Sequence, residues 1–193
     1  MSYISQLIYH GLLLHFVVME KAGFIDLLKR CGAIQFGHFV LTSGAESTYY
    51  IDIKKASTNP EILEQIAKQM NIYTADYDML AGMELGAVPL VVALALSTKL
   101  PYVIVRKQKR DHGTGKQIEG SDVTGKKVLI IEDVTTSGGS VVETIQVIRN
   151  KGGIVDTVLV VVDRKSGALE KIESMGVSLI PLLSVDDILD TPK

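Results

Sequence analysis

The segment from Val128 to Ser140 (VLIIEDVTTSGGS) has the residue types to bind a sugar phosphate. Four apolar residues lead into the adjacent acids Glu132 and Asp133, followed by a stretch rich in hydroxylated residues and glycine. Neighbouring carboxylates repel each other, and burying one without a partner is costly, so the pair is useful only where it faces hydroxyl donors or a cation. The stretch after it offers backbone N–H groups and hydroxyls at the start of a helix, which suits a phosphate dianion. Acids for sugar hydroxyls beside amides for a phosphate indicate a ribose 5-phosphate ligand.

Other interpretations of this segment are less specific. A buried strand followed by an ordinary polar helix cap would need only one acid and a short Ser-Gly-Gly stretch. A Walker A loop is excluded because no Gly-Lys-Ser/Thr follows the glycines, and a G-x-G-x-x-G pattern is also absent from the segment.

The elements expected to position these residues alternate along the chain. Short apolar runs predict strands, and amphipathic or small-residue stretches predict helices between them. Such alternation predicts an α/β fold in which a parallel sheet is flanked by helices, with ligands bound beyond the carboxyl ends of the strands. The acid pair is expected at such an end. The predicted strands are 78–82, 101–105, 128–131, 157–162 and 177–183, and the predicted helices are 88–96, 140–150 and 168–175. Between them, 106–127 is polar, contains glycine and has no apolar period.

The N-terminal third predicts different elements. A helix over 24–31 ends at Gly32, two extended segments at 36–41 and 49–53 flank a turn, and Asn59 caps a helix that begins at Pro60. We expect residues 1–18 to be an extension, either from an upstream start or as an extra packed segment. Residues 19–193 would then form a single domain, with a small N-terminal part over about 19–60 and a core over about 61–193.

Composition limits the class of protein. The chain is 47% hydrophobic and 22% charged, has a net charge of −2 and contains one cysteine. These values favour a globular domain without disulfides, and they argue against a general nucleic-acid binder. The apolar stretch at 7–19 is too short and too interrupted for a membrane span and lacks the features of a secretory signal. We therefore expect a cytoplasmic protein with no membrane or nucleic-acid partner.

The segment 128–140 resembles the phosphoribosyl pyrophosphate (PRPP) motif of the type I phosphoribosyltransferases. Three more segments resemble the orotate branch of that family. The first, 106–116, holds five basic residues and one acid and is similar to the catalytic loop R-K-x-x-K-x-H-G. The second, 36–52, is similar to the signature of the hood that covers the base, and the third, 82–89, to the pyrophosphate loop. The resemblance covers about residues 20–183 and implies a Rossmann-like core with a small N-terminal hood.

The chain departs from the family pattern at three places. Thr42 stands where many bacterial members have a lysine that contacts PRPP, and Leu85-Gly86 stands where they often have Tyr-Lys. The second lysine of the catalytic loop falls at Arg110, with Lys109 beside it, so either residue could be the main loop cation.

The resemblance also implies how the base is bound. Arg164 follows the apolar run 157–162 as the last residue of Val162-Asp163-Arg164, which is expected to end a strand. An arginine there can be a plain surface charge or can form a bidentate pair with a carboxylate. In the orotate enzymes an arginine here binds the orotate carboxylate together with a phosphate-loop threonine, which matches Thr136. Tyr50 and Ile51 would contact the base mostly through their backbone.

The function implied is Mg²⁺-dependent transfer of ribose 5-phosphate from PRPP to orotate, in a homodimer with shared active sites, for pyrimidine synthesis. Mg²⁺ would be held mainly by PRPP, with no protein side chain assigned to it. A purine phosphoribosyltransferase and a PRPP-sensing regulator without catalytic activity are the alternatives. The segment 106–116 could be a lid whose lysines stabilise the leaving pyrophosphate, or it could be a solvated surface loop of the same composition. The implied catalytic residues are Lys107, Lys109, Arg110, His112 and Asp133, and the implied PRPP-binding residues are Arg106, Lys107, Arg110, His112, Glu132, Asp133, Val134, Thr135, Thr136, Ser137, Gly138, Gly139 and Ser140.

Overall fold

The computed structural model describes residues 20–40, 44, 46–107 and 116–190 of the 193-residue chain. The predictions for residues 1–18, Thr42, Lys109, Arg110 and His112 lie outside this part. The strands are β1 (Ile34–Val40), β2 (Glu46–Ile51), β3 (Met79–Met83), β4 (Tyr102–Val105), β5 (Ile118–Gly120), β6 (Val128–Thr135), β7 (Thr157–Asp163) and β8 (Ser178–Ser184). The helices are α2 (Lys21–Arg30), α3 (Ile53–Ser57), α4 (Pro60–Asn71), α5 (Ala87–Thr98), α6 (Gly139–Asn150), α7 (Ala168–Glu173) and α8 (Val185–Leu189).

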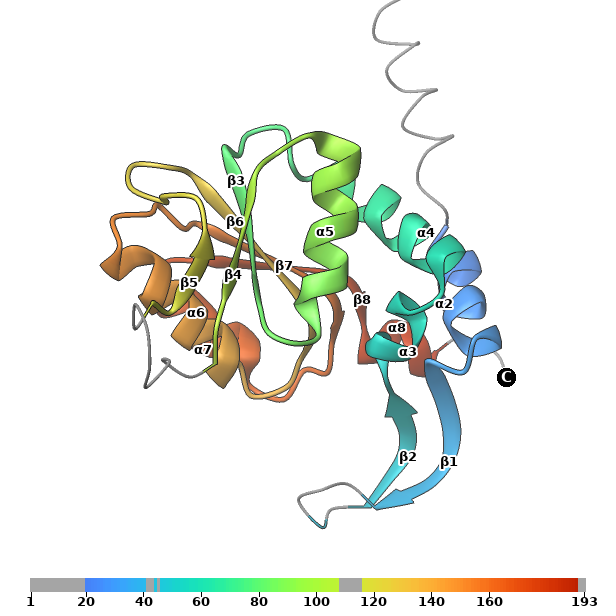
Figure 1. Cartoon of the computed structure of the whole chain (residues 1–193). Helices are drawn as coiled ribbons and strands as arrows, with labels where there is room; N and C mark the ends of the chain where they lie inside the picture. Colours follow the sequence, from blue (N-terminus) through green and yellow to red (C-terminus); the bar gives the residue numbers. More distant parts are fainter. Residues whose placement is uncertain (1–19, 41–43, 45, 108–115, 191–193) are drawn as a thin grey trace, which may run out of the picture.

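The main sheet has six strands in the order β5-β4-β3-β6-β7-β8 (Figure 1). The five strands from β4 to β8 in this order are parallel, and only the edge strand β5 runs antiparallel to its neighbour. The chain passes from β3 outward to β4 and later returns to the other side of β3 as β6. Strand order therefore reverses between β3 and β6. The expected parallel sheet with flanking helices is confirmed.

Alternate residues of the central strands pack on opposite faces of the sheet. Leu80, Leu129 and Ile131 face the layer formed by α2, α3, α4 and α5. Met79, Ile130 and their equivalents on β7 face α6 and α7. All seven residues of β7 are buried, as expected for a strand covered on both faces.

The two N-terminal strands form a second, smaller sheet. Strands β1 and β2 pair antiparallel as a two-stranded sheet that projects away from the main sheet (Figure 1). The expected N-cap is confirmed, because the Asn59 side chain accepts hydrogen bonds from the backbone N–H groups of Glu61 and Ile62. The extended segment expected to reach Ile53 ends earlier, because α3 begins at that residue.

Local structure differs from the sequence analysis at two further places. The polar stretch 106–127, for which no element was predicted, contains the short strand β5, which pairs with β4. The strand that carries the acid pair does not end at Ile131 but runs to Thr135, because β6 keeps pairing with β7 as far as Asp163.

Helix α5 differs from the other helices in having apolar residues on all sides. Its inner side chains, among them Leu90, Val91 and Leu94, are buried in the core. Its outer side is also apolar, and Leu96 is 67% exposed there. None of the helices in the described residues is both long enough and apolar enough to cross a membrane.

Candidate active site

A cavity of about 370 Å³ opens at the point where strand order reverses, between the carboxyl ends of β3 and β6. Open α/β sheets bind ligands at this kind of position. The wall is built by the loop after β3, the segment that leads from β6 into α6, one residue after β4 and one residue of α3. The lining residues are Lys54, Met83, Glu84, Leu85, Gly86, Lys107 and every residue from Glu132 to Val141.

The acid pair lies inside β6 and is almost fully buried. Glu132 is 7% exposed and Asp133 is 8% exposed. Glu132 Oε1 accepts a hydrogen bond from the backbone N–H of Asp133 at 3.0 Å, and Asp133 Oδ1 accepts one from Val134 N at 2.9 Å. Lys54 Nζ lies 3.3 Å from Asp133 Oδ2 and forms an ion pair with it.

Burial is the main influence on the pKa of Glu132. It raises the pKa of the Glu132 carboxyl well above its usual value, and the neighbouring charge of Asp133 raises it further. Partial burial alone would lower the pKa of Lys54. The charge of Asp133 and the hydrogen bond to it have the larger combined effect, so the pKa of Lys54 is raised. Burial therefore disfavours the charged form of Glu132, whereas the Asp133 carboxylate favours the charged form of Lys54.

The loop after β3 packs against the same acid. A Cβ atom added to Gly86 would lie 2.1 Å from Asp133 Oδ2, closer than any real Cβ contact. Only glycine can therefore occupy this position while the carboxylate stays where it is. The absence of a side chain at residue 86 is part of how the site is built.

The segment that follows the acids presents a free helix start. Gly138 has φ of 76° and precedes α6, whose first turn contains no acidic residue. Within the described part of the chain, no side chain caps this helix. The first N–H groups of a helix have no partner within it, and together with the helix dipole they form a ready site for an anion.

A buried carboxylate, Asp163, fixes the backbone that carries Arg164. Asp163 Oδ1 accepts hydrogen bonds from Thr135 Oγ1 at 2.8 Å and from Lys165 N at 3.2 Å. Arg164 N donates to the carbonyl of Thr135 at 3.0 Å. The end of β7 is thereby tied to the end of β6.

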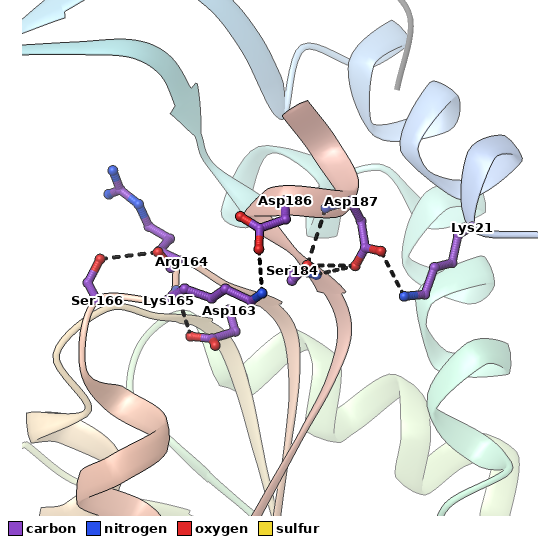
Figure 2. Close-up of polar contacts among 8 residues, drawn as sticks. All are labelled: Lys21, Asp163, Arg164, Lys165, Ser166, Ser184, Asp186 and Asp187. Atoms are coloured by element: carbon purple, nitrogen blue, oxygen red, sulfur yellow. Dashed lines mark hydrogen bonds and ion pairs between the residues drawn. The ribbon is translucent and has the colours of Figure 1, made fainter. Parts of the chain in front are cut away.

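The Arg164 guanidinium points away from this polar cluster (Figure 2). Lys165 turns toward α8 and pairs with Asp186, and Lys21 of α2 pairs with Asp187 of the same helix (Figure 2). Arg164 Cζ instead lies 5.4 Å from the centre of the Tyr49 ring of β2. Its buried Nε has no hydrogen-bond partner among the described residues.

The structure brings most of the predicted phosphate and sugar residues together. Lys107 and the whole stretch from Glu132 to Ser140 line the cavity. Arg106 does not line it, because its side chain turns to β5 and pairs with Glu119 at 3.7 Å. The loop residues Lys109, Arg110 and His112 lie outside the described residues.

The predicted base-binding residues are more scattered. Thr136 lines the cavity, whereas Tyr50, Ile51 and Arg164 lie outside its lining. The Tyr50 side chain is 41% exposed and stacks on Phe39, with ring centres 5.6 Å apart.

Sequence reasoning missed two residues of this region, Lys54 and Tyr49. Lys54 belongs to no motif, and its partner Asp133 is 79 residues away in the chain. Tyr49 was within a recognised segment, but only the alternation of side chains along β2 places it, rather than Tyr50, against Arg164.

The raised pKa of Glu132 predicts a pH-dependent cost to stability. A carboxyl whose pKa is higher in the folded state than in the unfolded state stabilises the fold fully below the unfolded pKa. That contribution is lost as the pH rises through the folded pKa. We expect Glu132→Gln, which keeps the acceptor for Asp133 N, to raise the thermal midpoint over wild type at pH 8. The difference should vanish near pH 4, as measured by calorimetry.

The exposed residue Glu173 of α7 offers a matched control. Glu173→Gln should leave the pH dependence of the midpoint unchanged. An equal midpoint for wild type and Glu132→Gln at every pH would contradict the assigned direction of the Glu132 pKa.

Comparison with known proteins agrees with this geometry. Residues 52–182 match the family model of the phosphoribosyl transferase domain. An orotate phosphoribosyltransferase of Pyrococcus horikoshii is 50% identical over 175 residues (87% of this chain and 92% of the relative), and one of Methanocaldococcus jannaschii is 49% identical over 173 residues (89% and 98%). The structure of Mycobacterium tuberculosis orotate phosphoribosyltransferase in complex with PRPP has a TM-score of 0.74 and 33% identity, covering 88% of this chain and 99% of that one. The chain therefore belongs to the orotate phosphoribosyltransferases, a family of pentosyltransferase enzymes with the type I phosphoribosyltransferase fold.

Proposed function

We propose that this chain transfers ribose 5-phosphate from PRPP to N1 of orotate, giving orotidine 5′-phosphate and pyrophosphate for UMP synthesis. The observation that carries this proposal is the arrangement of one cavity, in which a buried acid pair lies next to the uncapped start of α6. A sugar phosphate needs both features, because its hydroxyls donate hydrogen bonds and its phosphate accepts them.

The ribose and the 5-phosphate are bound by different groups of the protein. Glu132 and Asp133 accept hydrogen bonds from the 2′- and 3′-hydroxyls of the ribose. The backbone N–H groups and hydroxyls from Val134 to Ser140 surround the 5-phosphate. Hydroxyl donors favour the charged form of a carboxylate, so ribose binding offsets the cost of burying Glu132.

The reaction exchanges two bonds at C1 of the ribose. The bond from C1 to the pyrophosphate oxygen breaks and C1 gains cationic character. N1 of orotate passes its proton to water and forms the new bond to C1. Asp133 faces the sugar as positive charge develops. Lys107 and the loop residues Lys109, Arg110 and His112 neutralise the charge that builds on the leaving pyrophosphate, which lowers the barrier. Arg106 serves the active site of the second subunit.

Mg²⁺ fits the oxygen donors of this site when PRPP is bound. The described residues contain no group of three or more His, Cys, Asp or Glu side chains that could hold a metal ion. PRPP and water would provide the oxygens around the ion, as Mg²⁺ prefers, with no protein side chain assigned to it. When bound, the ion would supply positive charge against the pyrophosphate.

The base is recognised from β7 and the hood. Arg164 forms a bidentate pair with the orotate carboxylate, assisted by Thr136, while the backbone of Tyr50 and Ile51 contacts the ring. The ring of Tyr49 supports the Arg164 guanidinium from the hood side, since the two groups are already in contact. A hood over residues 19–60 would close on the base and exclude water.

A homodimer accounts for the outer side of α5. A helix that is apolar all round is normally buried, and its outer face carries Leu96, the half-buried Val88 and the half-buried Val92. A second copy of the chain packed on this face would bury these side chains and bring Arg106 of one subunit towards the other's site.

Action in the cytoplasm remains a prediction from the sequence.

The direct test of the proposed reaction is turnover of orotate with PRPP, with and without Mg²⁺, followed by loss of orotate absorbance. Adenine, hypoxanthine, xanthine and uracil are tested in parallel. We expect Mg²⁺-dependent consumption of orotate alone, abolished by a chelator. Consumption of a purine instead would contradict the base assignment, and no turnover of any base despite PRPP binding would favour a PRPP-sensing regulator.

The role of Arg164 predicts a selective loss of orotate recognition. Arg164→Ala should lower kcat/KM for orotate roughly 10- to 100-fold, because a charge-assisted hydrogen bond contributes on the order of 1.5–3 kcal/mol. The dissociation constant for PRPP should stay near that of wild type. Arg164→Lys should recover only part of the loss, since lysine cannot form the bidentate pair.

A control for that variant is Arg30→Ala on α2, where the arginine pairs with Asp26 at the surface. Arg30→Ala should leave kcat and KM for orotate unchanged. A parallel loss of PRPP affinity in Arg164→Ala would contradict a role confined to the base.

The α5 face predicts the state of assembly. Sedimentation equilibrium should give a dimer for the wild type, and Leu96→Glu should shift the equilibrium towards monomer because it places a charge in the apolar contact. Leu189→Glu, at another exposed leucine on α8, is the control and should remain dimeric. A monomeric wild type, or a dimer that Leu96→Glu does not weaken, would contradict this interface.

A further inference from the structure

Lys54 contributes a charge to the cavity from outside every recognised motif. It lies on α3, and its side chain is 60% exposed, yet its ammonium reaches the nearly buried Asp133 carboxylate at 3.3 Å. It is also one of the residues that line the cavity. One side of the ammonium therefore contacts the acid, and the rest faces the space where a ligand would bind.

Lys107, which follows β4, is the other cation among the described residues that line the cavity, and the loop after β3 carries none. Along the loop after β3 the only charged side chain is Glu84, which accepts a hydrogen bond from the backbone N–H of Lys107 at 3.0 Å. Gly86 of that loop packs directly on Asp133. Lys54 and the loop thus contact the same carboxylate, and the ammonium lies beside the loop expected to bind pyrophosphate.

We propose that Lys54 is a PRPP-binding residue that contacts the pyrophosphate group. This inference rests on the proposed use of PRPP at this site. In the free protein Lys54 neutralises Asp133. When the ribose hydroxyls engage Asp133, the ammonium, which has three N–H donors on a flexible stem, contacts pyrophosphate oxygens as well. Position 86 is often lysine in bacterial members of the family but is glycine in this chain. Lys54 on α3 supplies a cation beside this loop instead.

A purely structural role explains the ion pair between Lys54 and Asp133 less well than ligand binding does. An ion pair with one partner this exposed contributes little to stability, because water screens it and ordering a long side chain costs entropy. The core contacts of α3, through Ile53 and Ala56, already hold the helix in place.

Isothermal titration calorimetry on the full chain tests this inference with three ligands in the presence of Mg²⁺: PRPP, inorganic pyrophosphate and ribose 5-phosphate. Lys54→Ala should weaken PRPP and pyrophosphate about tenfold or more, the amount expected for a lost charge-assisted hydrogen bond, and leave ribose 5-phosphate nearly unchanged. Lys54→Arg should restore most of the affinity.

Lys55 provides a matched control on the same helix. It is exposed, and its ammonium lies over Gly32, where an added Cβ would be 2.7 Å from it. Lys55→Ala should bind all three ligands like wild type.

Two results would overturn the inference. One is unchanged PRPP and pyrophosphate affinity in Lys54→Ala. The other is an equal loss for all three ligands, which would mean that Lys54 only holds Asp133 in place. No base is present in these titrations, so a wild type that binds PRPP but does not consume orotate would refute the proposed reaction while leaving Lys54 to be judged on binding.

Discussion

Two neighbouring carboxylates, Glu132 and Asp133, are buried at the point where the sheet reverses its strand order, and the surrounding structure compensates for their charge. Burial and mutual repulsion raise the pKa of Glu132, while Asp133 is stabilised by Lys54 and by the backbone N–H of Val134. Such a pair is costly in the absence of ligand. The cost is offset when a ligand with several hydroxyl groups binds, and a ribose is such a ligand.

Several features of the fold are arranged around this pair. The loop after β3 approaches Asp133 so closely that a side chain at residue 86 would displace the carboxylate. The extension of β6 to Thr135 carries the chain directly towards the uncapped start of α6, so the acids and the amides proposed to bind phosphate belong to one continuous segment. Asp163 ties the end of β7 to Thr135 and thereby directs Arg164 towards the hood. The residues that we propose for sugar, phosphate and base recognition thus lie at the ends of neighbouring strands.

The parts of this arrangement that lie close together in sequence could be predicted. Apolar runs located the parallel strands, and the order of acids, hydroxyls and glycines in 128–140 indicated the ligand. Contacts between distant segments could not be predicted in the same way. The pairing of β5 depends on three residues, Ile118–Gly120, with no apolar pattern, and it determines that Arg106 turns to Glu119. The contact between Lys54 and Asp133, and the choice of Tyr49 over Tyr50, follow from how the hood packs on the core.

The most direct test of the central claim is a crystal structure of the protein with PRPP and Mg²⁺. Glu132 and Asp133 should then lie within hydrogen-bond distance of the 2′- and 3′-hydroxyls, with the 5-phosphate on the backbone N–H groups that precede and begin α6. A ribose bound elsewhere, or an acid pair that keeps the contacts of the free protein and touches no hydroxyl, would contradict the claim that this buried pair exists to bind the sugar.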